Sequence, residues 1–257
     1  MSMNTDQPGR ETCQVIGSPI DCLTWGRALA KVRQFSESGE GHYVCICNVH
    51  SVVTARLDPR FSSVIENADM ATSDGAPVAW LMRRLGVSGQ QRINGPDLMW
   101  AYCKEASLRG EPIFLYGGAA TTLELLKKKL LEQMPGIVIA GAYSPPFRAL
   151  SPVEDTQIVD MINASGAKTV WVSLGCPKQE LWMAEHRDKI KAVMIGVGAA
   201  FDYHAGVITR APRWMRDNGF EWLHRLCSEP RRLFKRYFIT NTLFVYFAMR
   251  QLLRLDR

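Results

Sequence analysis

Long apolar segments are missing from this 257-residue sequence. No window reaches the roughly 18 consecutive apolar residues that a membrane-spanning helix needs. The polar residues 1–14 also lack the apolar core of a secretory signal peptide. These absences argue against a secreted or membrane-spanning protein, and we expect residues 1–12 to be disordered.

Sequence motifs for dinucleotide, phosphate and zinc binding are also missing. There is no GxGxxG fingerprint and no GxxxxGK[ST] loop, and no CxxC pair or Cys/His cluster has zinc spacing. The seven cysteines are an odd number, and the one close pair, Cys45 and Cys47, lies in an apolar run where both side chains would point to the same side of a strand. We therefore expect free thiols in a reducing compartment.

The net charge of +6 is very unevenly distributed. Residues 207–257 contain eleven Lys and Arg against four Asp and Glu, a net charge of +7, so residues 1–206 carry about −1. Basic charge concentrated in one segment is the first indication of function, because it favours an acidic partner.

Short apolar segments alternate with helical ones between residues 43 and 198. We expect strands at residues 43–49, 112–118, 136–143, 167–175 and 192–198. Each is nearly continuously apolar, as is typical of strands that are covered on both faces. Helical periodicity marks residues 96–108, 121–134, 152–164 and 178–189. This order predicts an α/β domain over residues 13–206, with a mostly parallel, Rossmann-like sheet and helices on both faces.

The pattern changes after residue 206. No further strand–helix alternation is visible, and aromatic residues interleave with Arg and Lys. We expect short helices broken near Asn218-Gly219 and Glu229-Pro230, followed by one longer helix. Residues 207–257 are therefore predicted to form a basic, amphipathic, helical C-terminal appendage.

Polar residues and glycines follow several predicted strands, where open α/β sheets bind their ligands. Asn48 and His50 follow the first strand, and Tyr116, Gly117 and Gly118 end the second. Paired glycines let backbone N–H groups approach a phosphate at a helix N-terminus, although a simple tight turn would also need them.

Three polar side chains follow the last two predicted strands. Gln179 and Glu180 stand at a helix start, where Glu180 could simply cap the helix, while the amide of Gln179 suits a uracil edge or sugar hydroxyls. Asp202 follows the last strand between aromatic residues, and a buried carboxylate there needs a hydrogen-bonding partner, from the protein or from a ligand.

Two loops carry further candidates. Asp74 stands immediately before an expected amphipathic helix, so it is either that helix's N-cap or a functional carboxylate. Arg92, Gly95 and Asp97 form a turn into the next helix, where Asp97 again suits capping and Arg92 can meet an anion. We expect the residues of these loops and strand ends to converge at one rim of the sheet.

These residues belong to longer segments: NVH at 48–50, SDGAPVAW at 73–80, RINGPDL at 92–98, FLYGG at 114–118, SLGCPKQELW at 173–182, GVGAAFDYHAG at 196–206, and 210–237. In this order they resemble the WecG/TagA/CpsF family of bacterial glycosyltransferases (glycosyltransferase family 26). The resemblance covers about residues 40 to 245 and is most specific from 175 to 237.

The resemblance implies an inverting glycosyltransferase that moves a hexose-type sugar from a UDP-sugar to a polyprenyl-diphosphate-linked saccharide, in the synthesis of exopolysaccharide, teichoic acid or common antigen. It implies no bound metal and no cofactor, since the UDP-sugar is a substrate. By position, Asp74 matches the family's proposed catalytic base.

The resemblance also implies that Asn48, Arg92, Gln179 and Asp202 belong to the donor pocket. Arg225, Arg232 and Lys235 match basic positions of an appendage that closes over the active site at the membrane. One departure is Ile46, which stands where many members have a threonine, so any hydroxyl contact to the donor is absent or replaced, for example by His50.

A chemical role follows for two of these residues. An acceptor hydroxyl is a poor nucleophile at neutral pH, so Asp74 would take its proton as the attack develops. The leaving UDP develops charge on its diphosphate, and fixed cations such as Arg92, together with backbone donors, would stabilise that charge.

The apolar part of the appendage, residues 237–253, is rich in aromatics and flanked by arginines. This composition suits a helix lying in the interface of an anionic membrane, at the cytoplasmic face. Alternatives are packing on the sheet or on another subunit of a homo-oligomer. The rival functions, nucleic-acid binding, a nucleotide-dependent oxidoreductase and an inactive membrane-bound scaffold, are less well supported by the motifs.

Overall fold

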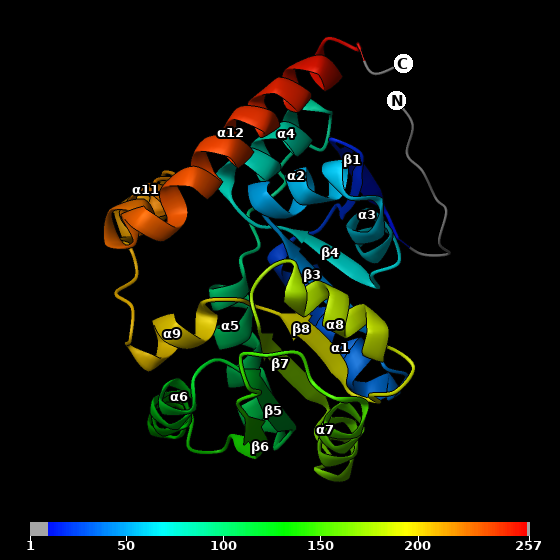
Figure 1. Cartoon of the computed structure of the whole chain (residues 1–257), viewed down its shortest axis with the longest axis vertical. Helices are drawn as coiled ribbons and strands as arrows, with labels where there is room; N and C mark the ends of the chain where they lie inside the picture. The colour runs from blue at the N-terminus through cyan, green and yellow to red at the C-terminus, as the bar shows by residue number, and fades with distance from the viewer. Residues whose placement is uncertain (1–9, 256–257) are drawn as a thin grey trace. The chain divides into compact units, whose positions relative to one another are not determined.

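The computed structural model describes residues 10–255, and it is an α/β structure (Figure 1). Six parallel strands form one sheet in the order β4-β3-β8-β7-β5-β6. Their bounds are β3 Tyr43–Cys47, β4 Met70–Ser73, β5 Pro112–Gly117, β6 Val138–Tyr143, β7 Thr169–Ser173 and β8 Val193–Gly196. The predicted fold class and all five predicted strands are confirmed.

The chain forms two compact units, which are described separately below. Among the described residues, unit 1 consists of residues 10–25, 46–94 and 209–255, and unit 2 of residues 26–45 and 95–208. The chain therefore leaves unit 2 at residue 208, close to residue 207, where the sequence analysis begins the appendage. What sequence patterning presents as a single domain over residues 13–206 contributes to both units.

Unit 2 contains most of the sheet, including the edge strand β6. Strands β8, β7, β5 and β6 pair in parallel, and the beginning of β3 pairs with β8. Side chains of β3, β7 and β8 are almost entirely buried, which explains why these strands read as continuous apolar runs. The helices are α1 Trp25–Ser38, α5 Gly95–Arg109, α6 Ala120–Gln133, α7 Pro152–Ala164, α8 Lys178–His186 and α9 Ala200–Ala205.

Local signals define several of these helices. Helix α7 begins with a capping box in which Ser151 and Glu154 exchange hydrogen bonds, and Pro152 occupies the first turn. Helix α9 ends at Gly206, which has the left-handed conformation that favours glycine. The four predicted helices therefore appear in the structure with small differences in their ends.

A histidine joins α7 to α8 inside unit 2. His186 Nε2 lies 3.0 Å from both carboxylate oxygens of Asp155, and its Nδ1 lies 2.7 Å from the carbonyl oxygen of Trp182. The imidazole is buried and stacks on the Trp182 ring at 4.3 Å. Both ring nitrogens have an acceptor, so this histidine stabilises the packing of two helices.

Unit 1 begins with a hairpin that sequence patterning did not indicate. Strands β1 (Thr12–Val15) and β2 (Ser18–Asp21) pair antiparallel around Ile16 and Gly17, both of which have positive φ. Positive φ at both positions of a two-residue loop is the geometry of the type I′ turn, whose twist matches that of the flanking strands. Strand β1 thus begins at Thr12, the last residue of the stretch predicted to be disordered, whereas residues 1–9 lie outside the described residues.

A buried ion pair ties this hairpin to the rest of unit 1. Arg10 lies 2.8 Å from Asp21, and both side chains are almost fully buried. The second role of Asp21 is to accept a hydrogen bond of 2.7 Å from the backbone N–H of Ala71 in β4. Arg10 therefore already belongs to the folded structure.

Unit 1 continues with α2 Val49–Leu57, α3 Pro59–Glu66 and α4 Ala76–Arg84. Of these, only α4 was expected. The predicted strand 43–49 ends two residues early, because Asn48 is the N-cap of α2 and accepts a hydrogen bond of 3.2 Å from the backbone N–H of Ser51. Strand β4 was also missed.

The C-terminal segment is helical, as predicted, with α10 Arg213–Asp217, α11 Glu221–Ser228 and α12 Pro230–Leu252. Breaks fall at residues 218–220 and at Glu229, as expected. Helix α12 packs on α2 and on the hairpin: Arg56 lies over the Phe247 ring, and the Gln251 amide exchanges hydrogen bonds with the backbone of Gln14 and Ile16. The appendage is thus an integral part of unit 1.

Candidate active site

Asp74 lies at the carboxyl end of β4, in unit 1. Its backbone N–H donates a hydrogen bond of 2.9 Å to the carbonyl of Cys47 at the end of β3. Gly75, with φ of +88°, then turns the chain into α4 and is itself the N-cap of that helix. No side chain of the described residues caps α4, so the simple N-cap interpretation of Asp74 is wrong and its carboxylate has another role.

The position of Arg92 follows from the loop that carries it. Residues 91–93 run alongside β4: the Ile93 N–H donates to the carbonyl of Ser73 at 2.8 Å, and the Thr72 hydroxyl donates to the carbonyl of Ile93 at 3.0 Å. The Ser73 hydroxyl also donates to the carbonyl of Gln91 at 2.9 Å. These bonds hold Arg92 beside Asp74, 18 residues away in sequence.

Asp74 and Arg92 form a half-buried ion pair, with Nε 3.4 Å from Oδ1 and side-chain exposures of 22% for Arg92 and 20% for Asp74. Burial raises the pKa of the Asp74 carboxyl above its ordinary value, while the charge and the hydrogen bond of Arg92 oppose this shift. A carboxylate whose pKa is raised binds a proton more strongly, as a general base must.

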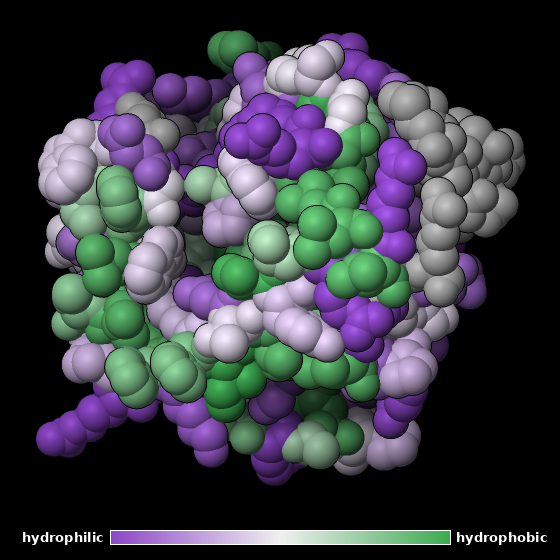
Figure 2. All heavy atoms as spheres, turned by 90° about the horizontal axis from the view of Figure 1, so that it is seen from above, coloured by the Kyte–Doolittle hydropathy of each residue, from purple (hydrophilic) through white to green (hydrophobic). Residues whose placement is uncertain are grey.

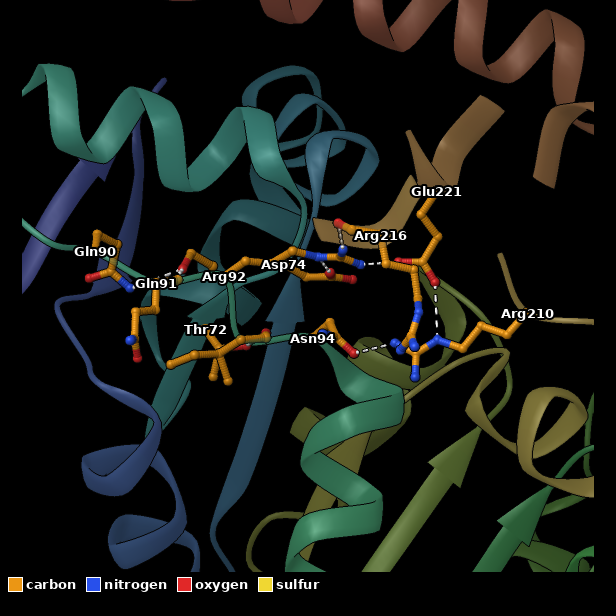
Figure 3. A network of polar contacts seen from close by, with 11 residues as sticks. Thr72, Asp74, Gln90, Gln91, Arg92, Asn94, Arg210, Arg216 and Glu221 are labelled. Atoms are coloured by element: carbon orange, nitrogen blue, oxygen red, sulfur yellow. Dashed lines mark hydrogen bonds and ion pairs between the residues drawn. The ribbon is translucent and has the colours of Figure 1, made fainter. Parts of the chain in front are cut away.

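Glu221 and Arg210 extend this pair into a network within unit 1 (Figure 3). The Glu221 carboxylate pairs with Arg92 through one oxygen and with Arg210, at 3.3 Å, through the other. Arg210 also donates to Asn94 at 3.2 Å, and Arg92 donates to the carbonyl of Arg216 at 3.3 Å. No sequence signal marked Glu221, Arg210 or Asn94 as functional residues.

Asn48 and His50 follow β3, also in unit 1. The oxygen of the Asn48 amide caps α2, and His50 lies in the first turn of that helix, with Nδ1 3.5 Å from the hydroxyl of Thr54. Because Cys47 bonds the backbone of Asp74, the chain enters α2 directly beside the residue predicted to be the base. Ile46, in place of the family's threonine, is buried in β3.

In unit 2, the glycine pair ends β5. Gly117 has φ of +107°, and a Cβ atom on it would lie 2.4 Å from the carbonyl oxygen of Ser173. Gly118 also has positive φ, and its N–H donates a hydrogen bond of 2.9 Å to the same oxygen. Tight-turn geometry therefore accounts for both glycines, and the Gly118 N–H is already hydrogen-bonded within the protein.

The Tyr116 side chain lies in the core of unit 2. It is 1% exposed, and its ring stacks on Trp182 at 4.3 Å and on Tyr143 at 6.4 Å. Burial is the first cause that raises the pKa of its phenol. Its ring therefore packs the interior, and a direct contact of this side chain with a donor has no support in this geometry.

Gln179 and Glu180 stand in the first turn of α8 and are both buried. The Gln179 oxygen accepts a hydrogen bond of 3.1 Å from the N–H of Gly198, and its nitrogen donates at 2.8 Å to Glu180. Burial raises the pKa of Glu180 to about 7, although the Gln179 and Cys176 side chains oppose the shift. Gln179 thus holds the loop after β8 in place.

Asp202 has the partner that its position requires. It lies in the first turn of α9 and accepts a hydrogen bond of 3.3 Å from the hydroxyl of Thr122 on α6. Gly118 lies close by, since a Cβ atom on it would be 3.4 Å from Phe201 and 4.0 Å from Thr122. The structure therefore brings Asp202 and the glycine pair together in unit 2.

Gly95 and Asp97 begin α5, also in unit 2. A Cβ atom on Gly95 would lie 3.2 Å from the carbonyl oxygen of Val197, so a glycine lets α5 pack closely on the end of β8. Asp97 is in the first turn, as capping predicts. His204 anchors the same turn by a hydrogen bond of 2.8 Å to the Pro96 carbonyl.

The three basic residues predicted for the appendage lie on two helices of unit 1, Arg225 on α11 and Arg232 and Lys235 on α12. Lys235 is exposed. Apolar side chains are exposed on the same helix, and in the space-filling view apolar and strongly polar side chains lie next to one another (Figure 2).

Polar side chains at the carboxyl ends of parallel strands define the class: a doubly wound α/β protein with its functional residues after the strands. A family model described as "Glycosyl transferase WecG/TagA/CpsF family" matches residues 13–257, nearly the whole chain. The chain therefore belongs to this family of glycosyltransferases, which act in cell-surface polysaccharide synthesis.

Proposed function

We propose that this glycosyltransferase transfers a hexose-type sugar from a UDP-sugar, with inversion and without a metal, to a saccharide linked to polyprenyl diphosphate. Asp74 acts as the general base for the acceptor hydroxyl, and Arg92 stabilises negative charge on the leaving diphosphate. The observation that carries this proposal is the half-buried Asp74–Arg92 pair at the end of β4.

An inverting transfer needs a base that accepts the proton of the attacking hydroxyl and a cation that stabilises the leaving group. Asp74 suits the first role because burial raises the pKa of its carboxyl, so that it accepts a proton readily. Arg92 suits the second because nearby carboxylates raise its pKa, against the effect of its own burial, and keep its guanidinium charged.

We further propose that the strand ends of unit 2 contribute to donor binding. Asp202, held by Thr122, presents a carboxylate near Gly118, and Gln179 holds the Gly198 turn. Carboxylates and backbone groups at strand ends are suited to the hydroxyl and amide groups of a nucleotide sugar. Asn48 and His50 are further donor-pocket residues in the proposal.

The Asp74→Asn variant tests the role of the base. We expect turnover to fall by about a thousandfold or more, with donor binding retained, because the amide keeps the shape but accepts no proton. UDP release in the presence of a polyprenyl-diphosphate saccharide measures turnover, and thermal stabilisation by UDP-sugar measures binding. Turnover near the wild-type rate would exclude Asp74 as the base.

The pH profile gives a second test of the same role. For a base, kcat/KM falls as the pH drops through the pKa of its free-enzyme carboxyl. Because burial raises the pKa of Asp74, the acidic limb of the wild type should lie above the ordinary pKa range of aspartate.

A panel of UDP-sugars, screened first for thermal stabilisation and then for turnover, would identify the donor.

A further inference from the structure

Glu221 is the first residue of α11, and its carboxylate faces two arginines. One oxygen pairs with Arg92 Nη2, and the other lies 3.3 Å from Arg210 Nε. The Glu221 side chain is only 14% exposed. A carboxylate this buried keeps its charge only where cations offset the cost of burial, and here two arginines do so.

Arg92 is consequently shared between two carboxylates. Its Nε faces Asp74, its Nη2 faces Glu221, and its Nη1 donates to the backbone carbonyl of Arg216. All three guanidinium nitrogens therefore have a partner within unit 1 (Figure 3). The planar guanidinium is rigid, so fixing Nη1 and Nη2 also fixes the direction in which Nε points.

We propose that Glu221 is a positioning residue of the transfer reaction: together with Arg210, which pairs with its other oxygen, it holds Arg92 beside Asp74 and so makes the state of the base depend on the C-terminal segment. The inference rests on the proposed role of Asp74. Glu221 acts through Arg92, since it is Arg92 that contacts Asp74.

The electrostatic consequence has a definite sign. The charged groups around Asp74 are Arg92 from the loop before α5 and Glu221 from α11, with Arg210 bound to the other side of Glu221. Burial is the main cause that raises the pKa of Asp74, Arg92 lowers it, and the negative charge of Glu221 raises it. Although burial opposes the ionisation of Glu221, the two arginines hold its pKa below the ordinary value, so it is charged at neutral pH.

Two substitutions should therefore shift the pKa of Asp74 in opposite directions. Glu221→Gln removes a negative charge and leaves Arg92 to Asp74 alone, so the pKa of Asp74 falls. Arg210→Gln removes the cation that compensates Glu221, so the pKa of Asp74 rises. If Glu221 and Arg210 had a merely structural role, neither substitution would shift the pKa of Asp74.

The test measures kcat/KM against pH for the full-length protein, together with the carboxyl carbon signal of Asp74 by NMR titration. We expect the acidic limb to move to lower pH in Glu221→Gln, with kcat at pH 8 reduced about tenfold because a base of lower pKa is weaker. The limb should move to higher pH in Arg210→Gln and return toward the wild-type position in Glu221→Asp.

Glu66→Gln is the matched control. Glu66 is exposed, pairs with Ser62, and precedes β4, whereas Asp74 follows that strand, so the two lie at opposite ends of it. The control makes the same change in net charge and should leave the limb unmoved. Circular dichroism establishes that each variant is folded, and Arg210→Gln and Glu221→Asp carry the test if Glu221→Gln does not fold.

An Asp74 titration and an acidic limb that stay unchanged in both Glu221→Gln and Arg210→Gln would overturn the inference. Its failure is distinguishable from that of the proposed function. If Asp74→Asn keeps full turnover, the base is another residue and the proposed function fails. If Asp74→Asn is inactive while the acidic limb stays in place in Glu221→Gln and Arg210→Gln, only the proposed coupling of Glu221 to Asp74 fails.

Discussion

At the scale of single residues, ionisable side chains in this protein are buried in two different ways. Asp74 and Glu221 are buried beside arginines that compensate their charge. Among the described residues, the bonded partners of the buried Glu180 side chain are the neutral Gln179 amide and the Cys176 thiol. The pKa of Glu180 is raised whereas that of Glu221 is lowered, because an uncompensated carboxyl is stable in the interior only when it is protonated.

The burial of Glu180 predicts how the free energy of unfolding depends on pH. Burial raises its pKa from 4.5 to about 7 in the folded state. A raised folded-state pKa contributes stability that is fully present below the unfolded pKa and is lost as the pH rises through the folded one, so the loss falls between pH 4.5 and about 7. The Glu180→Gln variant, which keeps the oxygen that Gln179 bonds, should escape this loss.

We expect Glu180→Gln to gain stability relative to the wild type as the pH rises from 5 to 8, by about 3 kcal/mol at most. Urea denaturation at several pH values measures it. Glu185→Gln, at an exposed position of the same helix, is the control and should show no such trend. A difference between Glu180→Gln and wild type that does not change with pH would contradict the assignment.

Elements are joined by turns whose geometry only certain residues can adopt. Gly117 at the end of β5 combines positive φ with a Ser173 carbonyl at the place where a Cβ atom would go. Gly166 before β7 also has positive φ, but no atom lies within 4 Å of such a Cβ. Substitutions at Gly117 and Gly166 therefore separate the cost of positive φ from the cost of a contact with the Ser173 carbonyl.

Gly117→Ala should lower the free energy of unfolding by about 3–5 kcal/mol, from strained backbone and overpacking together. Gly166→Ala should lower it by only about 1 kcal/mol, from the backbone alone. Chemical denaturation of the two variants measures both values. Equal losses would show that the contact between β5 and β7 relaxes easily and that the conformation is the whole cost.

At the scale of the whole molecule, the C-terminal segment combines a docked helix with an exposed apolar face. Phe234, Phe238, Val245 and Met249 on α12 are 61%, 67%, 60% and 52% exposed. At 100° per residue, the spacing of these four positions places them within about 60° of one another around the helix. No helix of the described residues is long and apolar enough to cross a membrane, and an apolar stripe with basic flanks is instead suited to the interface of an anionic bilayer.

We expect full-length protein to bind anionic vesicles and the double variant Phe238→Ser/Val245→Ser to bind at least about tenfold more weakly, because each buried apolar side chain contributes roughly 1.5–3 kcal/mol. Co-sedimentation with vesicles measures binding. Phe147→Ser is the matched control, since Phe147 in unit 2 is 99% exposed but belongs to no apolar stripe.

Unchanged vesicle binding by the double variant would show that α12 does not enter the interface. Sedimentation velocity then tests whether a second copy of the protein covers the stripe. A protein that self-associates through α12 would lose that association in Phe238→Ser/Val245→Ser, whereas a stripe that serves neither purpose would leave both measurements unchanged.

The α/β class, the five apolar strands and the breaks in the C-terminal helices could be predicted from the sequence, because burial on both faces, periodicity and the residues Asn218-Gly219 and Glu229-Pro230 are local signals. Sequence patterning missed strand β4, whose four residues are too short to show a period, and the hairpin around Ile16, which is an unusual residue at positive φ. The motifs also led to Asp74 and Arg92, and to the family.

Which groups these residues contact depends on long-range packing, which sequence patterns do not show. Nothing in the local sequence connects Arg92 to Glu221, 129 residues further on, yet the return of the C-terminal segment to unit 1 brings the two into an ion pair. The same holds for Gln179, whose amide is bound to Gly198 and Glu180. Local propensity acts over a few residues, whereas partners of buried charges are selected by long-range packing, because each such charge must find compensation wherever the fold places one.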